Sequence, residues 1–164
     1  MPRKKRLKLR LIIPLVLAAL AIATLLMGNE ILNAYGAWHG VKNLEPDQVS
    51  MLRQENLLVL DVREPEEFAV SHLANASLAK DIDLTQLDPE QPILLYCTVG
   101  LRSTELGTTL TQQGFHNIYN LSGGLIRWKN QGKAVYNEFE QPTDSVHVYS
   151  GLFGLVLRNG LAVD

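Results

Sequence analysis

The chain has 164 residues, of which 46% are hydrophobic and 20% are charged. This composition excludes wholesale disorder and suits one packed domain with a short appendage. The single cysteine excludes an internal disulfide, a Cys-rich zinc site and a dithiol redox cycle without a partner's thiol. Residues 1–10 hold six of the 15 Lys and Arg residues, and no acidic residue precedes Glu30, so the remainder carries nine basic against 17 acidic side chains. An acidic body argues against a nucleic-acid partner, because phosphate contact needs clustered Lys and Arg.

An apolar run at residues 11–27 follows the basic start, and Thr24 is its one polar side chain. At about 1.5 Å per residue the run spans roughly 25 Å, the lower limit for crossing a bilayer, and Gly28 extends it slightly. A core helix would show a polar stripe, which this run lacks. The sequence therefore predicts one transmembrane helix at residues 11–28.

A basic start and an apolar run are typical both of an uncleaved signal anchor and of a cleaved signal peptide. The small residues Ala21 and Ala23 resemble a cleavage site, but residues 24–27 continue the apolar run beyond them, which favours the anchor. The positive-inside rule then keeps residues 1–10 in the cytoplasm. The rest of the chain is expected to lie in an extracytoplasmic compartment, the periplasm or a lumen, with residues 29–43 as a linker.

From residue 44 onward, short apolar runs alternate with helical patterns. Buried strands are expected in three runs, at residues 57–60, 93–96 and 117–121. Helices are expected in three segments, at residues 46–54, 102–113 and 123–131. This alternation predicts an α/β domain with a parallel sheet flanked by helices. Sites in such sheets form at the carboxyl ends of strands, where Asp61 and Cys97 stand.

The segment from Cys97 to Ser103 joins a predicted strand to a predicted helix. Such a turn points backbone N–H groups inward, Gly100 permits a backbone angle that other residues resist, and Arg102 adds a cation. These effects favour an anion at the Cys97 sulfur and make it a candidate thiolate nucleophile; a small buried hydrophobic side chain is the alternative role. Four residues separate Cys97 from Arg102. This loop is shorter than the C-x5-R phosphate loop of tyrosine phosphatases, which argues against phosphatase chemistry.

Two further blocks accompany this loop, at residues 60–76 and 120–132. The three blocks resemble, in order and spacing, the DVRE-x-x-EF-x-x-GHI-x-GA, C-x-x-G-x-R-S and L-x-GG-x-x-x-W-x-x-x-G blocks of the single-domain rhodanese, or thiosulfate sulfurtransferase, family. The resemblance covers about residues 44–136. It implies a rhodanese-like parallel sheet flanked by helices.

The resemblance also implies a reaction. Cys97 would take a sulfane sulfur from a small anionic donor such as thiosulfate, become a persulfide, and pass the sulfur to an acceptor thiol or cyanide, with no cofactor and no metal. Asp61 and Arg63 are expected to brace the loop as an ion pair, and His72 to be structural. The loop residues expected to bind substrate, through their N–H groups and the Arg102 cation, are Thr98, Val99, Gly100, Leu101, Arg102 and Ser103.

The chain departs from the family pattern at three positions, Ser71, Asn75 and Gly107. A glycine inside the predicted helix is expected to cost about 1 kcal/mol of helix stability. Residues 137–164 continue past the resemblance, and the apolar stretch at 146–157 is too short to span a membrane. This extension is expected to add an edge strand, to pack as a helix, or to contact the bilayer or a protein partner. It also favours the alternative to an enzyme, a non-catalytic rhodanese-fold module that docks a membrane partner.

Overall fold

The computed structural model describes residues 13, 14, 16, 27–52 and 56–164. The chain divides into two compact units, residues 1–31 and 32–164. The predicted basic N-terminus and most of the predicted transmembrane helix therefore lie outside the described residues. Among the residues that the structure describes, no helix is both long enough and apolar enough to cross a membrane.

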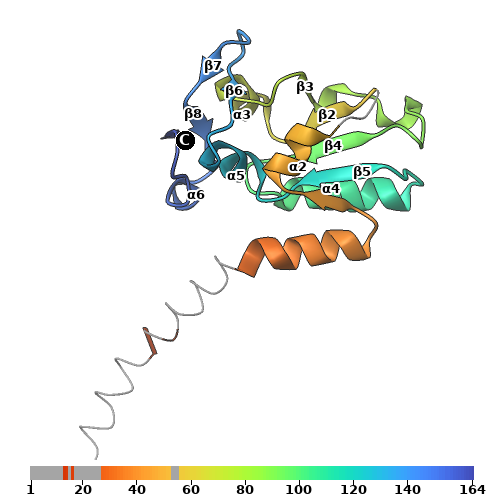
Figure 1. Cartoon of the computed structure of the whole chain (residues 1–164), viewed down its shortest axis with the longest axis horizontal. Helices are drawn as coiled ribbons and strands as arrows, with labels where there is room; N and C mark the ends of the chain where they lie inside the picture. Colours follow the sequence, from red (N-terminus) through yellow and green to blue (C-terminus); the bar gives the residue numbers. More distant parts are fainter. Residues whose placement is uncertain (1–12, 15, 17–26, 53–55) are drawn as a thin grey trace, which may run out of the picture. The chain divides into compact units, whose positions relative to one another are not determined.

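A five-stranded parallel sheet forms the centre of the second unit (Figure 1), with the strand order β1-β5-β4-β2-β3. All four strand pairings are parallel. The strands are β1 (Lys42–Leu44), β2 (Leu58–Asp61), β3 (Ala76–Leu78), β4 (Ile93–Tyr96) and β5 (Ile118–Leu121). The predicted α/β fold with a central parallel sheet is confirmed, and each of the three predicted strands lies within one residue of its expected bounds.

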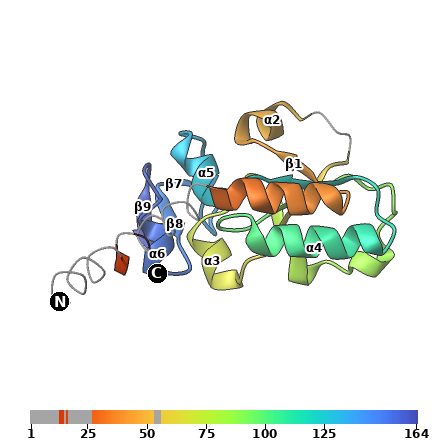
Figure 2. The ribbon, with the colours of Figure 1, turned by 90° about the horizontal axis from the view of Figure 1, so that it is seen from below.

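Helices cover both faces of this sheet (Figure 2). They are α2 (Pro46–Met51), α3 (Pro65–Val70), α4 (Leu101–Gln112) and α5 (Gly124–Asn130), with short 3-10 helices η1 (Ala79–Asp81) and η2 (Leu84–Gln86). Successive side chains of a strand point to opposite faces, so Leu95 joins one core with Leu110 of α4, whereas Tyr96 joins a second core with Leu125 of α5. The predicted helices correspond to α2, α4 and α5. The sequence did not predict α3.

The segment expected to be a linker, residues 29–43, is structured instead. Residues 32–38 are helical and lie beside α4 (Figure 2). Asn33 Nδ2 donates to Ser122 Oγ, just after β5, at 2.9 Å. Residues 42–44 form β1, which pairs with β5. A strand of three residues with a polar centre produces no apolar run, so β1 could not be predicted from the sequence.

Gly107 is explained by the close packing of α4 against the sheet. A Cβ atom there would lie 3.1 Å from Val41 Cγ2 and 3.3 Å from both Ile118 Cγ2 and Leu95 Cδ1. These distances are tighter than ordinary van der Waals contact. Glycine thus allows an approach that offsets its low helix propensity.

The extension at residues 137–164 packs onto the domain through short elements. In the extension, β7 (Pro142–Thr143) pairs antiparallel with β6 (Val135–Tyr136), which lies just before it, and β8 (Ser145–His147) pairs parallel with β9 (Leu161–Val163). The single-turn helix α6 (Gly151–Gly154) lies between β8 and β9 in the chain. Val146 and Val148 are almost completely buried in the second core. Of the arrangements expected for the extension, the structure shows both strands and a helical turn, and none of these strands joins the central sheet.

Candidate active site

The Cys97 thiol lies inside the turn between β4 and α4. The Gly100 N–H donates to Cys97 Sγ at 3.1 Å, and Ser103 Oγ lies 3.6 Å from the same sulfur. Gly100 has φ +96° and is the N-cap of α4, so the position favours glycine. The sulfur therefore sits at the positive end of a twelve-residue helix, with one backbone and one hydroxyl donor at hand.

The first turn of α5 donates hydrogen bonds to the backbone carbonyls of this loop. Leu125 and Ile126 donate their N–H groups to the carbonyls of Cys97 and Thr98, at 2.8 and 3.1 Å. Gly124 has φ +59°, and a Cβ atom there would lie 2.4 Å from the Cys97 carbonyl oxygen. The second glycine of the Gly-Gly motif is thus required by the close approach of two backbones. These contacts turn the carbonyls of Cys97 and Thr98 toward α5, while the Gly100 N–H points to the Cys97 sulfur.

Arg102 lies beside the sulfur but is paired with a residue to which the sequence assigned no role. Its Nη1 and Nη2 atoms donate to the two carboxylate oxygens of Glu67 at 2.7 and 2.8 Å. The Thr98 hydroxyl also donates to Glu67, at 3.1 Å. Glu67 belongs to α3, so its carboxylate ties that helix to both the start and the end of the cysteine loop. The Arg102 side chain remains 31% exposed, whereas that of Glu67 is 4% exposed.

The pKa values of this pair are displaced in opposite directions. Burial opposes ionisation of Glu67, but hydrogen bonds from Arg102 and from the Glu64 backbone outweigh it, and the pKa of Glu67 lies below its ordinary value. Hydrogen bonds to Glu67 raise the pKa of Arg102, with burial opposing and the neighbouring Cys97 contributing. Both groups are therefore ionised together over the ordinary pH range.

Asp61 and Arg63 form the expected ion pair, with Arg63 Nη2 2.7 Å from Asp61 Oδ2 and both side chains fully buried. The pair was expected to brace the cysteine loop, but its other contacts lie outside that loop. Arg63 also donates to the Ser71 carbonyl, and its guanidinium lies over the Tyr96 ring at 5.8 Å. Among the described residues, no hydrogen bond links this pair to the loop at 97–103. The pair supports the end of β4, and the bracing of the loop falls to Glu67.

The remaining predicted residues are placed as follows. Leu101 is the first residue of α4 and is exposed, whereas Val99 is half-buried and packs against the second core. His72 is buried, stacks on Phe68 at 4.0 Å between ring centroids, and has its Nδ1 atom 3.0 Å from the Phe68 carbonyl. These contacts agree with the expected structural role of His72.

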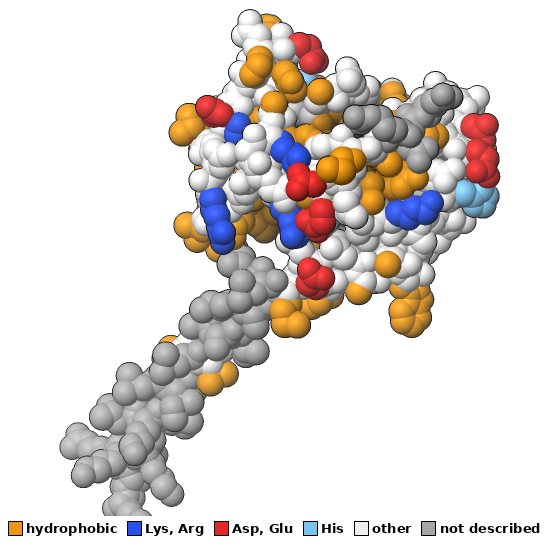
Figure 3. All heavy atoms as spheres, in the orientation of Figure 1, with side chains coloured by type: hydrophobic (Ala, Val, Ile, Leu, Met, Phe, Trp, Pro, Cys, Tyr) orange, Lys and Arg blue, Asp and Glu red, His pale blue; other side chains and the backbone are white. Residues whose placement is uncertain are grey.

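A cavity of about 530 Å³ opens beside Arg102 rather than directly over Cys97. Its walls include both acidic and basic side chains, among them Glu64, Lys80, Arg102 and Glu105. Charges are mixed elsewhere too, as Figure 3 shows for one face of the molecule, where acidic, basic and apolar side chains are interspersed. This distribution suits a small anion held near one guanidinium better than a polyanion spread over a basic surface.

Glu67 is the site residue that sequence reasoning missed. It lies three residues after Glu64, and the two form a capping box at the start of α3, which Pro65 opens. A Glu three residues after a helix N-cap is a recognisable signal, but it predicts a cap. The bond to Arg102, 35 positions away, depends on how α3 and α4 meet in space.

Comparison with known proteins identifies the domain. The family model for the rhodanese-like domain matches residues 45–131. Thiosulfate sulfurtransferase GlpE of Pseudomonas aeruginosa is 34% identical over 95 residues, which cover 54% of this chain and 84% of that protein. GlpE of Coxiella burnetii is 34% identical over 83 residues, covering 48% and 78% of the two chains.

Solved structures agree with this result. The polysulfide-sulfur transferase homodimer of Wolinella succinogenes is 26% identical with a TM-score of 0.52, over 70% of this chain and 90% of that one. A rhodanese-related protein of Thermoplasma volcanium is also 26% identical, with a TM-score of 0.51, over 59% and 99% of the two chains. The relatives named as thiosulfate sulfurtransferases support the predicted kind of enzyme. The chain belongs to the rhodanese-like family.

Proposed function

We propose that the chain moves sulfane sulfur from a small anionic donor to a thiol or cyanide through a persulfide on Cys97. The observation that carries this proposal is the position of the Cys97 sulfur, inside a turn where the Gly100 N–H donates to it at 3.1 Å. The GlpE relatives, named as thiosulfate sulfurtransferases, support the same reaction class and thiosulfate as the donor. The reaction uses no cofactor.

The reaction proceeds in two displacements on sulfur. The Cys97 thiolate attacks the outer sulfur of thiosulfate, the sulfur–sulfur bond of the donor breaks, and sulfite leaves with the electron pair. Cyanide or an acceptor thiolate then attacks the terminal sulfur of the persulfide. Thiocyanate or a new persulfide leaves, and the Cys97 thiolate is regenerated. No external oxidant or reductant takes part.

Loop residues have distinct roles in this scheme. The N–H groups of residues 98–103 hold the terminal sulfur of the persulfide anion, because the α5 contacts turn the carbonyls of Cys97 and Thr98 away. Arg102 attracts the donor from the side of the cavity, with its position set by Glu67. Asp61 and Arg63 support the strand end that carries Cys97.

The test is a thiocyanate assay on the full chain in detergent, with thiosulfate as donor and cyanide as acceptor. Steady thiocyanate formation, lost in Cys97→Ser, is the expected result. A folded protein that forms no thiocyanate from thiosulfate or from a small persulfide would instead support the non-catalytic binding module. Exposed apolar side chains of the extension, such as Phe139, Leu152 and Leu155, favour that second reading. Absence of aryl-phosphate hydrolysis would exclude a phosphatase.

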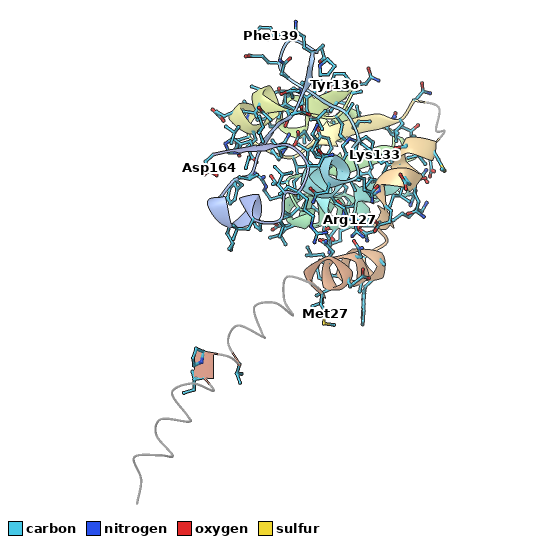
Figure 4. All side chains as sticks on the ribbon, turned by 60° about the vertical axis from the view of Figure 1, so that its left-hand side comes forward. Met27, Arg127, Lys133, Tyr136, Phe139 and Asp164 are labelled. Carbon is cyan, nitrogen blue, oxygen red and sulfur yellow. The ribbon has the colours of Figure 1, made fainter. Side chains whose placement is uncertain are left out.

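The proposal extends to location, with residues 11–28 as a membrane anchor, residues 1–10 in the cytoplasm and the catalytic domain on the far side. Its support is the apolar run behind a cluster of six basic residues. Because Cys97 is buried, it is a poor target for the bulky membrane-impermeant reagents that report sidedness, although it is open to small alkylating agents. Phe139 is 71% exposed and lies near the tip of the β6–β7 hairpin (Figure 4), so Phe139→Cys in a Cys97→Ser background gives one accessible thiol.

A membrane-impermeant thiol reagent added to intact cells, or to sealed vesicles of known sidedness, reads that thiol. Labelling from the extracytoplasmic side without membrane disruption is expected. Labelling from the cytoplasmic side alone would show that the proposed orientation is wrong.

A further inference from the structure

The C-terminal extension reaches the active-site loop from beyond the rhodanese-like domain, whose family match ends at residue 131. Val146 and Val148 of the extension are buried in the same core against which Val99 of the cysteine loop packs. A second contact is polar: the guanidinium carbon of Arg102 lies 5.0 Å from the centroid of the Tyr149 ring. Arg102 therefore contacts a segment that the family model does not include, and Val99 packs against a core that this segment helps to form.

The backbone at Tyr149 is held in an unusual conformation. Tyr149 has φ +64°, and the Ser150 N–H donates to the Val148 carbonyl at 2.7 Å across it. A three-residue turn with positive φ at its centre is rare and strained, more so for a residue with a bulky side chain. On one side the turn is fixed by the Val148 N–H, which donates to Val163 of β9 at 2.9 Å.

Burial of the Tyr149 ring does not explain this strain, because the residue is 63% exposed. This conformation allows Val148 to be buried while the adjacent Tyr149 side chain contacts Arg102. Strained backbone that is fixed by its surroundings is concentrated at functional sites. Tyr149 contacts Arg102, and Arg102 is two residues from Gly100, whose N–H donates to the Cys97 sulfur. This contact is the observation that points to a functional role for the strained turn.

The Arg102 guanidinium is thus restrained by three neighbours. Glu67 accepts two of its hydrogen bonds, the Thr98 hydroxyl oxygen accepts a third from Nη2 at 3.2 Å, and the guanidinium carbon lies over the Tyr149 ring. Cation–π contacts of this kind are attractive and directional. Without the ring, the 31% exposed side chain would keep its hydrogen bonds to Glu67 and Thr98 but lose its contact with the extension.

We propose that Tyr149 is a positioning and specificity residue, supplied by the extension, which holds the Arg102 guanidinium beside Cys97 so that small anionic sulfur donors are favoured over uncharged ones. This inference rests on the proposed sulfurtransferase function. It adds the extension to the active site, a role that was not among those expected for residues 137–164.

The first test compares donors of different charge. Tyr149→Ala in the full chain is expected to raise the KM for thiosulfate about threefold, the order expected for one partly exposed cation–π contact, with little change for an uncharged persulfide donor. Tyr149→Phe keeps the ring and is expected to restore the thiosulfate KM. Leu152→Ala is the control, because Leu152 is 68% exposed in the same extension. Equal changes for both donors, or no change, would overturn the proposal.

A second test does not depend on sulfur transfer. Cys97 is the only thiol, so its alkylation by iodoacetate, an anion, and by iodoacetamide, its neutral counterpart, can be compared directly. The rate with iodoacetate divided by the rate with iodoacetamide is expected to fall in Tyr149→Ala and in Arg102→Ala. It should stay at the wild-type value in Leu152→Ala. A fall in Arg102→Ala alone would overturn the role of Tyr149. If wild type forms no thiocyanate, the proposed function fails. The alkylation ratio still decides whether Tyr149 increases the preference of the Cys97 site for anionic reagents.

Tyr149→Gly separates the role of the ring from the stability of the turn. Glycine relieves the strain of the positive φ, so the thermal unfolding midpoint is expected to be no lower than that of wild type. The thiosulfate KM and the alkylation ratio should nevertheless match those of Tyr149→Ala. A wild-type ratio in a stable Tyr149→Gly variant would show that the ring has no influence on the site.

Discussion

Two carboxylate–arginine pairs lie next to the cysteine loop, and they differ in exposure and in what they connect. The Asp61–Arg63 pair is fully buried and joins residues two positions apart. The Glu67–Arg102 pair links α3 to the start of α4, and its arginine is 31% exposed. A pair sealed from solvent can only support its surroundings, whereas a pair open on one side can also meet a substrate. The comparison teaches that exposure, rather than the residue types, separates a structural pair from a functional one.

The largest effect is expected where the sealed pair is broken. Arg63→Ala leaves the Asp61 carboxylate buried without its partner, and such changes cost about 3–5 kcal/mol. Denaturant unfolding of the variant measures the loss. Replacing both residues, as Asp61→Leu with Arg63→Met, should recover much of it, since two apolar side chains leave no uncompensated charge. A double variant as unstable as Arg63→Ala would show that the charges themselves are required.

Glu67→Gln is expected to have a smaller effect on stability and a larger one on activity. The amide keeps the volume but weakens the bonds to Arg102 and Thr98, at a cost of about 2 kcal/mol. Because those bonds position the loop, kcat/KM for thiosulfate should fall about tenfold, a change of about 1.4 kcal/mol in transition-state stabilisation. Glu66→Gln, an exposed neighbour on the same helix, is the control. A wild-type kcat/KM in Glu67→Gln would place the brace of the loop elsewhere.

Arg102→Ala sharpens the comparison by donor charge. The kcat/KM for thiosulfate should fall about tenfold more than that for an uncharged persulfide donor, because Arg102 is the one basic residue of the loop from Cys97 to Ser103. Arg102→Lys keeps the charge and loses the planar fork, so it should recover part of the selectivity. Equal losses for the two donors would mean that Arg102 serves the structure of the loop alone.

The smallest expected effect is on the free energy of unfolding at acidic pH. The pKa of Glu67 is lowered on folding, so the carboxylate stabilises the fold above its unfolded pKa of about 4.3, and this contribution is lost as the pH falls through the lower folded value. The difference in unfolding free energy between wild type and Glu67→Gln should therefore shrink between pH 5 and pH 3. Measurement at several pH values in this range checks it, and a difference that grows on acidification would contradict the sign.

The sequence predicted the parts of the site that are contiguous in the chain. Short apolar runs located β2, β4 and β5, and the spacing from Cys97 to Ser103 located the loop, because both signals lie within a few residues. Glu67 was missed because its partner is 35 positions away and only the meeting of α3 with α4 brings them together. Asp61 and Arg63 were given the bracing role because they lie at the carboxyl end of the neighbouring strand, although their hydrogen bonds are made to each other and to Ser71.

Contacts of the extension were beyond prediction for the same reason. The alternation of Val146 and Val148 with polar residues was too loose to choose between a strand and a helix, and the structure places both side chains in the second core. The positive φ at Tyr149 has no sequence signal, because a bulky residue rarely adopts this conformation and no glycine or asparagine marks the turn.

The most direct test of the account is the intact mass of the full chain after treatment with thiosulfate. One added sulfur atom per chain is expected, carried by Cys97, removed by cyanide and absent from Cys97→Ser. That variant should keep its fold, because loss of one buried sulfur is a small change in packing compared with loss of the nucleophile. A folded wild-type chain that gains no sulfur from thiosulfate or from a small persulfide, or a Cys97→Ser variant that gains one, would contradict the persulfide mechanism.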